Sequence, residues 1–185
     1  KFFTPVFLAA FLFISFNASS IPKLNSYPTA IATIFLDFDG HYVQSSVWNN
    51  GMPFHCGASG MTDPQITEAF YRVAEDYRPF NINITTDSTV FLAAPLNRRM
   101  RIIITTTSSW SPGVGGVAFI GSFNWGDDTP AFVFSDRLGP YSPKMVGECI
   151  SHESGHTVGL AHQSKYGASC STPIEQYNSG IGSGE

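Results

Sequence analysis

The fold follows from the segment 142–162, which reads SPKMVGECISHESGHTVGLAH. Ser142 can cap a helix with its hydroxyl, and Pro143 suits the first helical position, where no backbone N–H donor is needed. We expect the helix to run to about Val158, because Gly159 can adopt the left-handed conformation that ends many helices. Beyond that point the chain turns instead of continuing as a helix.

Three histidines in this segment follow the pattern H-E-x-x-H-x-x-G-x-x-H. His152 and His156 are four residues apart, so on a helix both imidazoles project from one face and reach one ion. The turn at Gly159 lets His162 swing back as a third ligand. Three neutral imidazoles leave zinc its full charge and one open position, which is the arrangement of a catalytic site. We therefore predict one catalytic Zn²⁺ bound by His152, His156 and His162.

Glu153 lies about 100° around the helix from the first of these histidines and can face a cleft beside the metal. Zinc lowers the pKa of a bound water towards about 7. A carboxylate there can accept the water's proton and pass it to a leaving amine, so Glu153 is the predicted general base. A chance match to all five positions has odds on the order of one in a hundred thousand. His41 and His55 have no partner at ligand spacing and are predicted to lie in loops.

The residues upstream predict a sheet and one further helix. β-Branched and apolar residues indicate a buried strand at 29–38, and Asp63-Pro64 begins a helix with an apolar stripe that ends before Pro79. Residues 51–60 are predicted to be a loop, and no strong element is expected after Gly159. Four more strands are predicted, at 80–85, 100–105, 115–120 and 131–134. The expected class is α+β: a twisted, mixed five-stranded sheet with a backing helix and an active-site helix.

The motif at 152–162 resembles the long zinc motif of the metzincin metallopeptidases. Four further stretches are similar to bacterial secreted, reprolysin-like (adamalysin-like) members, namely DYRPFNINITTD (Asp76–Asp87), GGVAFIGSF (Gly115–Phe123), PAFVF (Pro130–Phe134) and YNSGIGSGE (Tyr177–Glu185). The resemblance covers most of residues 29–185. It implies a metzincin-like catalytic domain at 21–185, with an upper subdomain to about residue 159 and a lower one at 160–185. It also implies a secreted zinc endopeptidase that hydrolyses internal peptide bonds.

The stretch 115–120 carries small residues and little charge, so an extended peptide can pair with its backbone groups. The resemblance places this strand along the rim of the cleft. It assigns substrate binding to the backbone of Gly116, Val117, Ala118 and Phe119. The expected partner is therefore a protein or peptide substrate.

Two features depart from the family pattern. A methionine-containing turn normally follows the zinc motif, but the four methionines here (Met52, Met61, Met100 and Met145) all precede it. We therefore expect a fragment with an incomplete lower subdomain, which leaves its activity and side-chain preference open. Gln163 follows the third histidine, where Asp, Glu, Ser or Pro usually marks the subfamily, so the subfamily is also open.

A second signature lies at 34–40 (IFLDFDG), a strand that ends in Asp-x-Asp-Gly as in haloacid-dehalogenase-like phosphatases. In a Mg²⁺-dependent phosphatase Asp37 would be the nucleophile and Asp39 the acid/base. The order of the downstream acidic residues and lysines is the reverse of that family's, and export fits it poorly. The same carboxylates could instead cap a turn or contribute to a Ca²⁺ site, which we leave unassigned. A third alternative is a zinc-binding pseudoenzyme or adhesion module, against which Glu153 argues.

The N-terminus has the layout of a secretory signal peptide. A basic first residue precedes the apolar run 5–16 (PVFLAAFLFISF), and Ala18-Ser19-Ser20 supplies small residues for cleavage. The run is shorter than the roughly 20 residues that span a bilayer. We therefore predict a signal peptide at 1–20, an extracellular location and no stable membrane anchor in the mature chain.

The composition supports one folded domain. The chain has 185 residues, of which 43% are apolar and 13% charged, so it can form a packed core. A net charge of −4 without a basic stripe argues against nucleic acid as a partner. Cys170 can bridge to Cys56 or Cys149, and the spacing does not decide between them. Cys149 is otherwise expected to be a small core side chain, and the oligomeric state is not determined.

Overall fold

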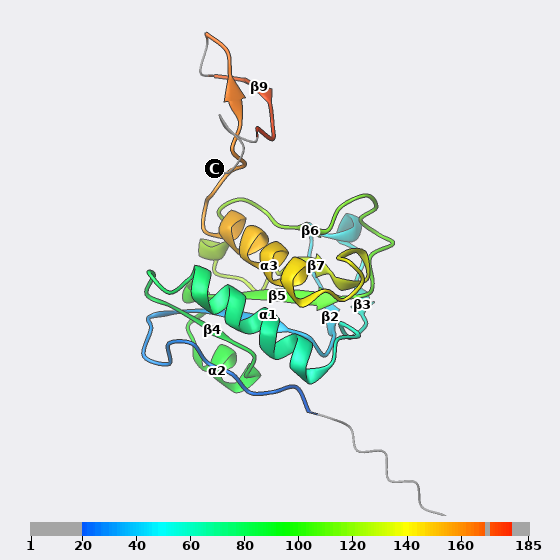
Figure 1. The fold of residues 1–185 in the computed structure, drawn as a ribbon, viewed down its shortest axis with the longest axis vertical. Helices are drawn as coiled ribbons and strands as arrows, with labels where there is room; N and C mark the ends of the chain where they lie inside the picture. The colour runs from blue at the N-terminus through cyan, green and yellow to red at the C-terminus, as the bar shows by residue number, and fades with distance from the viewer. Residues whose placement is uncertain (1–19, 169–170, 179–185) are drawn as a thin grey trace, which may run out of the picture.

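The computed structural model describes residues 20–168 and 171–178. Apart from Ser20, the predicted signal peptide lies outside the described residues, and so do Cys170 and the chain from 179 onward. A central sheet carries two long helices side by side on one face (Figure 1). The fold is thus mixed α/β, and it is compatible with the predicted α+β class.

The sheet has five strands in the order β4-β1-β5-β7-β6. Their bounds are β1 (Ala32–Asp37), β4 (Ile82–Thr85), β5 (Arg99–Thr105), β6 (Gly116–Val117) and β7 (Ala131–Phe134). The first four strands of that order run parallel to one another, and β6 is antiparallel to β7. The prediction of a mixed five-stranded sheet is therefore confirmed, with β6 at one edge.

The two long helices begin where the sequence predicts, and each start is capped. In α1 (Asp63–Asp76) the side chain of Gln65 accepts a hydrogen bond from the backbone N–H of Thr62 at 2.9 Å. In α3 (Pro143–Thr157) the hydroxyl of Ser142 accepts from the backbone N–H of Met145. Both helices bury their apolar stripes in one core on the same face of the sheet.

The opposite face of the sheet carries an aromatic layer and a short helix, α2 (Ser88–Ala93). Phe35 points to this face and stacks on Phe91 of α2, with ring centroids 5.1 Å apart. Phe132 and Phe134 of β7 are fully buried beside Trp48. Each such aromatic side chain contributes about 2 kcal/mol or more when it leaves water.

Several short elements were not predicted from the sequence. They are α2, β2 (His41–Val43), β3 (Phe54–Cys56), β8 (Lys165–Tyr166), β9 (Pro173–Glu175) and the 3₁₀ turns at Asn49–Gly51, Leu96–Arg98, Ser122–Asn124 and Ser135–Arg137. The loop prediction for His41 and His55 was wrong, because both lie on the β2–β3 hairpin. That hairpin forms because Val43 and Cys56 pack into the aromatic layer, a contact that sequence periodicity does not reveal.

The hairpin of β8 and β9 projects from the end of α3 (Figure 1). Among the described residues, no helix combines the length and the apolar character that a bilayer span requires.

Candidate metal centre

The three predicted ligands converge at the end of α3. The Nε2 atoms of His152 and His156 are 3.0 Å apart, those of His156 and His162 are 2.9 Å apart, and those of His152 and His162 are 3.2 Å apart. Among the residues that the structure describes, these side chains form the one group of three or more that could hold a metal ion. A metal site at these histidines is therefore compatible with the geometry.

The donor set fits zinc. A neutral imidazole carries one proton on its two nitrogens, so three Nε2 atoms facing one another cannot all be satisfied by hydrogen bonds among themselves. Tetrahedral zinc with bonds of about 2.0–2.1 Å to nitrogen separates its ligand atoms by about 3.3 Å. The observed separations of 2.9 to 3.2 Å are close to this value.

A second set of contacts orients the ligands. Nδ1 of His156 lies 2.7 Å from the backbone carbonyl of Leu160, so it carries the proton and leaves the Nε2 lone pair free for a cation. Gly159, with a φ of +102°, makes the turn that presents this carbonyl. Burial lowers the pKa of both His152 and His162, and electrostatic repulsion from His156 lowers it further. Both effects favour the neutral, metal-binding forms of these side chains. Sequence reasoning found Gly159 but missed the role of Leu160.

Glu153 lies beside the histidines without joining their group. It is 5% exposed, and burial raises its pKa to about 7. Its side chain contacts β6, because a Cβ atom added to Gly116 would lie 2.7 Å from Cγ of Glu153. The predicted general base is therefore adjacent to the predicted substrate-binding strand.

The edge strand is shorter than predicted. Gly116 and Val117 pair with β7, whereas Ala118 and Phe119 lie beyond the strand. The register would place Phe119 opposite Pro130, which has no N–H to donate. The carbonyl of Pro130 already accepts a hydrogen bond of 2.8 Å from the indole of Trp48, so the ladder ends there.

The segment after β6 is hydrogen-bonded to α3. The backbone N–H of Gly121 donates to the carbonyl of His156 at 2.9 Å, and Gly121 has a φ of +77°. This bond holds the edge strand and the histidine-bearing end of α3 together.

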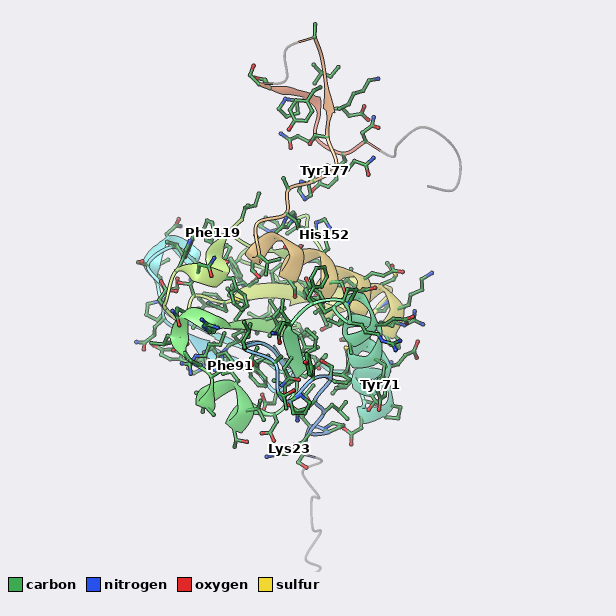
Figure 2. All side chains as sticks on the ribbon, turned by 90° about the vertical axis from the view of Figure 1, so that its left-hand side faces the viewer. Lys23, Tyr71, Phe91, Phe119, His152 and Tyr177 are labelled. Carbon is green, nitrogen blue, oxygen red and sulfur yellow. The ribbon has the colours of Figure 1, made fainter. Side chains whose placement is uncertain are left out.

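Tyr177 is a site residue that sequence reasoning missed. Its hydroxyl lies 3.0 Å from Nε2 of His162, and the two ring centroids are 4.1 Å apart. The β8–β9 hairpin brings it back, with the N–H of Asn178 donating to the carbonyl of Gln163 at 2.9 Å. Figure 2 shows Tyr177 at the base of this hairpin, on the side of the molecule where His152 lies. A cavity of about 480 Å³ is lined by His152, His162 and Tyr177 among others.

The alternative site at Asp37 has a different character. Asp37 is 1% exposed, and its Oδ2 contacts the guanidinium of Arg101. Asp39 is exposed, and neither carboxylate belongs to a metal-capable group within the described residues. A nucleophile needs an open approach for its substrate, and the burial of Asp37 gives it none.

Cys56 and Cys149 form no disulfide within the described residues. Burial raises the pKa of Cys56 and of Cys149 to about 12. Cys149, one turn before His152, packs against the core between the sheet and the long helices, as predicted. Any pairing with Cys170 involves a residue outside the described part of the chain.

Comparison with known proteins adds no family to this geometry, because no protein-family model and no curated protein sequence matches the chain. The chemistry of the site therefore has to be judged from its own side chains.

Proposed function

We propose that this protein is a secreted zinc endopeptidase of the metzincin type, which hydrolyses internal bonds of protein or peptide substrates. The observation that carries the proposal is the convergence of three imidazole Nε2 atoms within 3.2 Å of one another. Glu153, next in sequence to the first of them, faces the edge strand.

His152, His156 and His162 would hold the zinc ion. When bound, zinc supplies a Lewis acid that polarises the scissile carbonyl and makes water a stronger acid. Glu153 accepts a proton from the attacking water on its carboxylate and releases it to the leaving amine. Burial raises the pKa of Glu153 to about 7 in the metal-free protein, and the charge of a bound ion would favour the ionised, proton-accepting form of the carboxyl group.

The edge of β6 would align the substrate. One side of Gly116 and Val117 pairs with β7, and the backbone groups on the other side can pair with an extended peptide. Because Gly116 touches Glu153, a peptide bound along β6 would pass beside the carboxylate.

The test is the substitution Glu153→Gln, which keeps the shape of the side chain but removes its basicity. We expect one zinc per chain in the variant and a loss of peptidase activity of several orders of magnitude. Zinc would be measured by elemental analysis, and activity with a library of quenched fluorescent peptides. Glu148→Gln is the matched control, since Glu148 lies on the same helix with an exposed side chain.

The possible results separate the candidate functions. Undiminished peptide cleavage by Glu153→Gln would refute the mechanism, and a wild-type protein without zinc would refute the site. Zinc binding without cleavage of any peptide would support a binding module instead. Phosphatase activity that disappears in Asp37→Asn would support the remaining alternative.

A further inference from the structure

Gly116 is the point at which the edge strand meets Glu153. A Cβ atom at this position would lie 2.7 Å from Cγ of Glu153 and 2.8 Å from its Oε1. It would also lie 2.8 Å from the backbone carbonyl of Phe132 on β7. Separations under 3.0 Å are essentially never seen for real Cβ atoms, so some group must move if a side chain is added.

The backbone itself does not require glycine at position 116. Gly116 is absent from the residues with a positive φ, so an L-residue could adopt its conformation without strain. The missing side chain therefore matters for the space that it leaves and not for the dihedral angles.

The alternation of side chains along the edge segment also places position 116 next to α3. Val117 and Phe119 pack into the aromatic layer on one face, while Ala118 packs with the core on the face that carries α3. Side chains alternate along an extended chain, so Gly116 and Ala118 share the α3 face. Both positions next to the helix are thus occupied by the smallest residues.

We propose that Gly116 is a positioning residue, whose lack of a side chain keeps the carboxylate of Glu153 in place against the edge strand. Its catalytic consequence rests on the proposed peptidase function, whereas the contact itself does not. A methyl group at position 116 cannot move towards β7, because the Phe132 carbonyl blocks that side. The flexible end of Glu153 must give way, and the carboxylate is displaced.

The first experiment measures catalysis and zinc in Gly116→Ala. We expect zinc affinity within about twofold of wild type and a kcat lowered by about 10- to 100-fold with little change in KM, since a misplacement of about 1 Å can cost 10²-fold. Gly57→Ala is the matched control, because its Cβ would meet only Thr106 and Thr107 hydroxyls at an ordinary 3.6 Å. An unchanged kcat, or a rise confined to KM, would overturn the proposal.

The second experiment needs no activity. The urea midpoint of unfolding is compared for wild type, Gly116→Ala, Glu153→Ala and the double variant, all without zinc. Glu153→Ala removes Cγ and Oε1, so Gly116→Ala should lower the midpoint clearly in the wild-type background and at most half as much in the Glu153→Ala background. An equal loss in both backgrounds overturns the proposal, because the Phe132 carbonyl would then be the whole obstacle. If Gly116→Ala alone does not fold, recovery in the double variant supports the proposal, and its failure to recover overturns it.

The two experiments also separate this proposal from the proposed function. If the wild-type protein cleaves no peptide, the peptidase assignment fails, but the coupling between positions 116 and 153 can still be measured. An active peptidase without that coupling removes only the role of Gly116.

Discussion

At the scale of single residues, burial changes the chemistry of a carboxyl group at Asp37. The pKa of Asp37 is raised to about 7, chiefly by burial and then by the side chain of Asp39, against the lowering effect of Arg101. An Asp in an unfolded chain titrates near 3.9. The folded protein therefore holds a proton on Asp37 over a pH window in which the unfolded chain has released it.

This difference makes stability depend on pH. Between about pH 4 and pH 7 the folded state binds more protons than the unfolded state at this residue, so the free energy of unfolding falls as the pH rises. The contribution of Asp37 to the free energy of unfolding is largest below pH 4. Above that pH it falls by at most about 1.4 kcal/mol per pH unit. Asp37→Asn should remove that slope, as measured by urea unfolding at several pH values. If the variant kept the same slope as wild type, Asp37 would not be the group that titrates in this pH range.

At the scale of elements, α1 and α3 meet closely at Gly147. A Cβ atom there would lie 3.2 Å from Cβ of Arg72 and 3.3 Å from the carbonyl of Ala69, which is tighter than ordinary packing. A Cβ atom at Gly155 on the same helix would meet Leu160 at 3.4 Å, which is an ordinary contact. The two glycines thus differ in what they do for the packing of α3.

Alanine at each position should reveal the difference. Alanine favours a helix over glycine by up to about 1 kcal/mol, so we expect Gly155→Ala to raise the free energy of unfolding. At Gly147 the same gain is offset by overpacking against α1, and we expect no gain or a loss. Urea unfolding of the zinc-free variants measures both values. A larger gain at Gly147 than at Gly155 would contradict the close helix contact.

Sequence reasoning succeeded for elements whose signals lie within their own residues. The helix from Ser142 to about Val158 was predictable from its cap and its terminal glycine, and the strand 131–134 from its unbroken apolar run. It failed for β2, β3 and α2, which have three to six residues and depend on distant partners. Periodicity has too few residues there to act as a signal.

The same distinction applies to the site. The three histidines were predictable because their spacing on one helix and one turn is set locally. The contact of Gly116 with Glu153 joins residues far apart in sequence, and it depends on β6 lying at the sheet edge next to α3. Tyr177 reaches His162 only through the β8–β9 hairpin, which the sequence pattern did not predict.

At the scale of the whole molecule, the histidines connect two parts of the chain. His152 and His156 belong to a helix packed on the sheet, whereas His162 begins the segment that leads into the β8–β9 hairpin. An ion bound by all three stabilises the folded state alone, because the unfolded chain has no preformed site.

Zinc should therefore raise the melting temperature, and a chelator should reverse the rise. At a free zinc concentration of 1,000 Kd the added stability is about 4 kcal/mol. His162→Ala should lose most of the shift, while His55→Ala, on the β2–β3 hairpin, should keep it. Thermal scans with and without chelator measure both. An undiminished shift in His162→Ala would place the ion elsewhere.

The imidazole donors occupy one run of eleven consecutive residues, 152–162. Capturing an ion consequently closes only a short loop and sacrifices little chain entropy. The edge strand β6 instead takes its place only when strands far apart in sequence assemble into the sheet, which is slower. The metal site thus needs only α3 and the turn at Gly159, whereas the contact between Gly116 and Glu153 forms only when the sheet is complete.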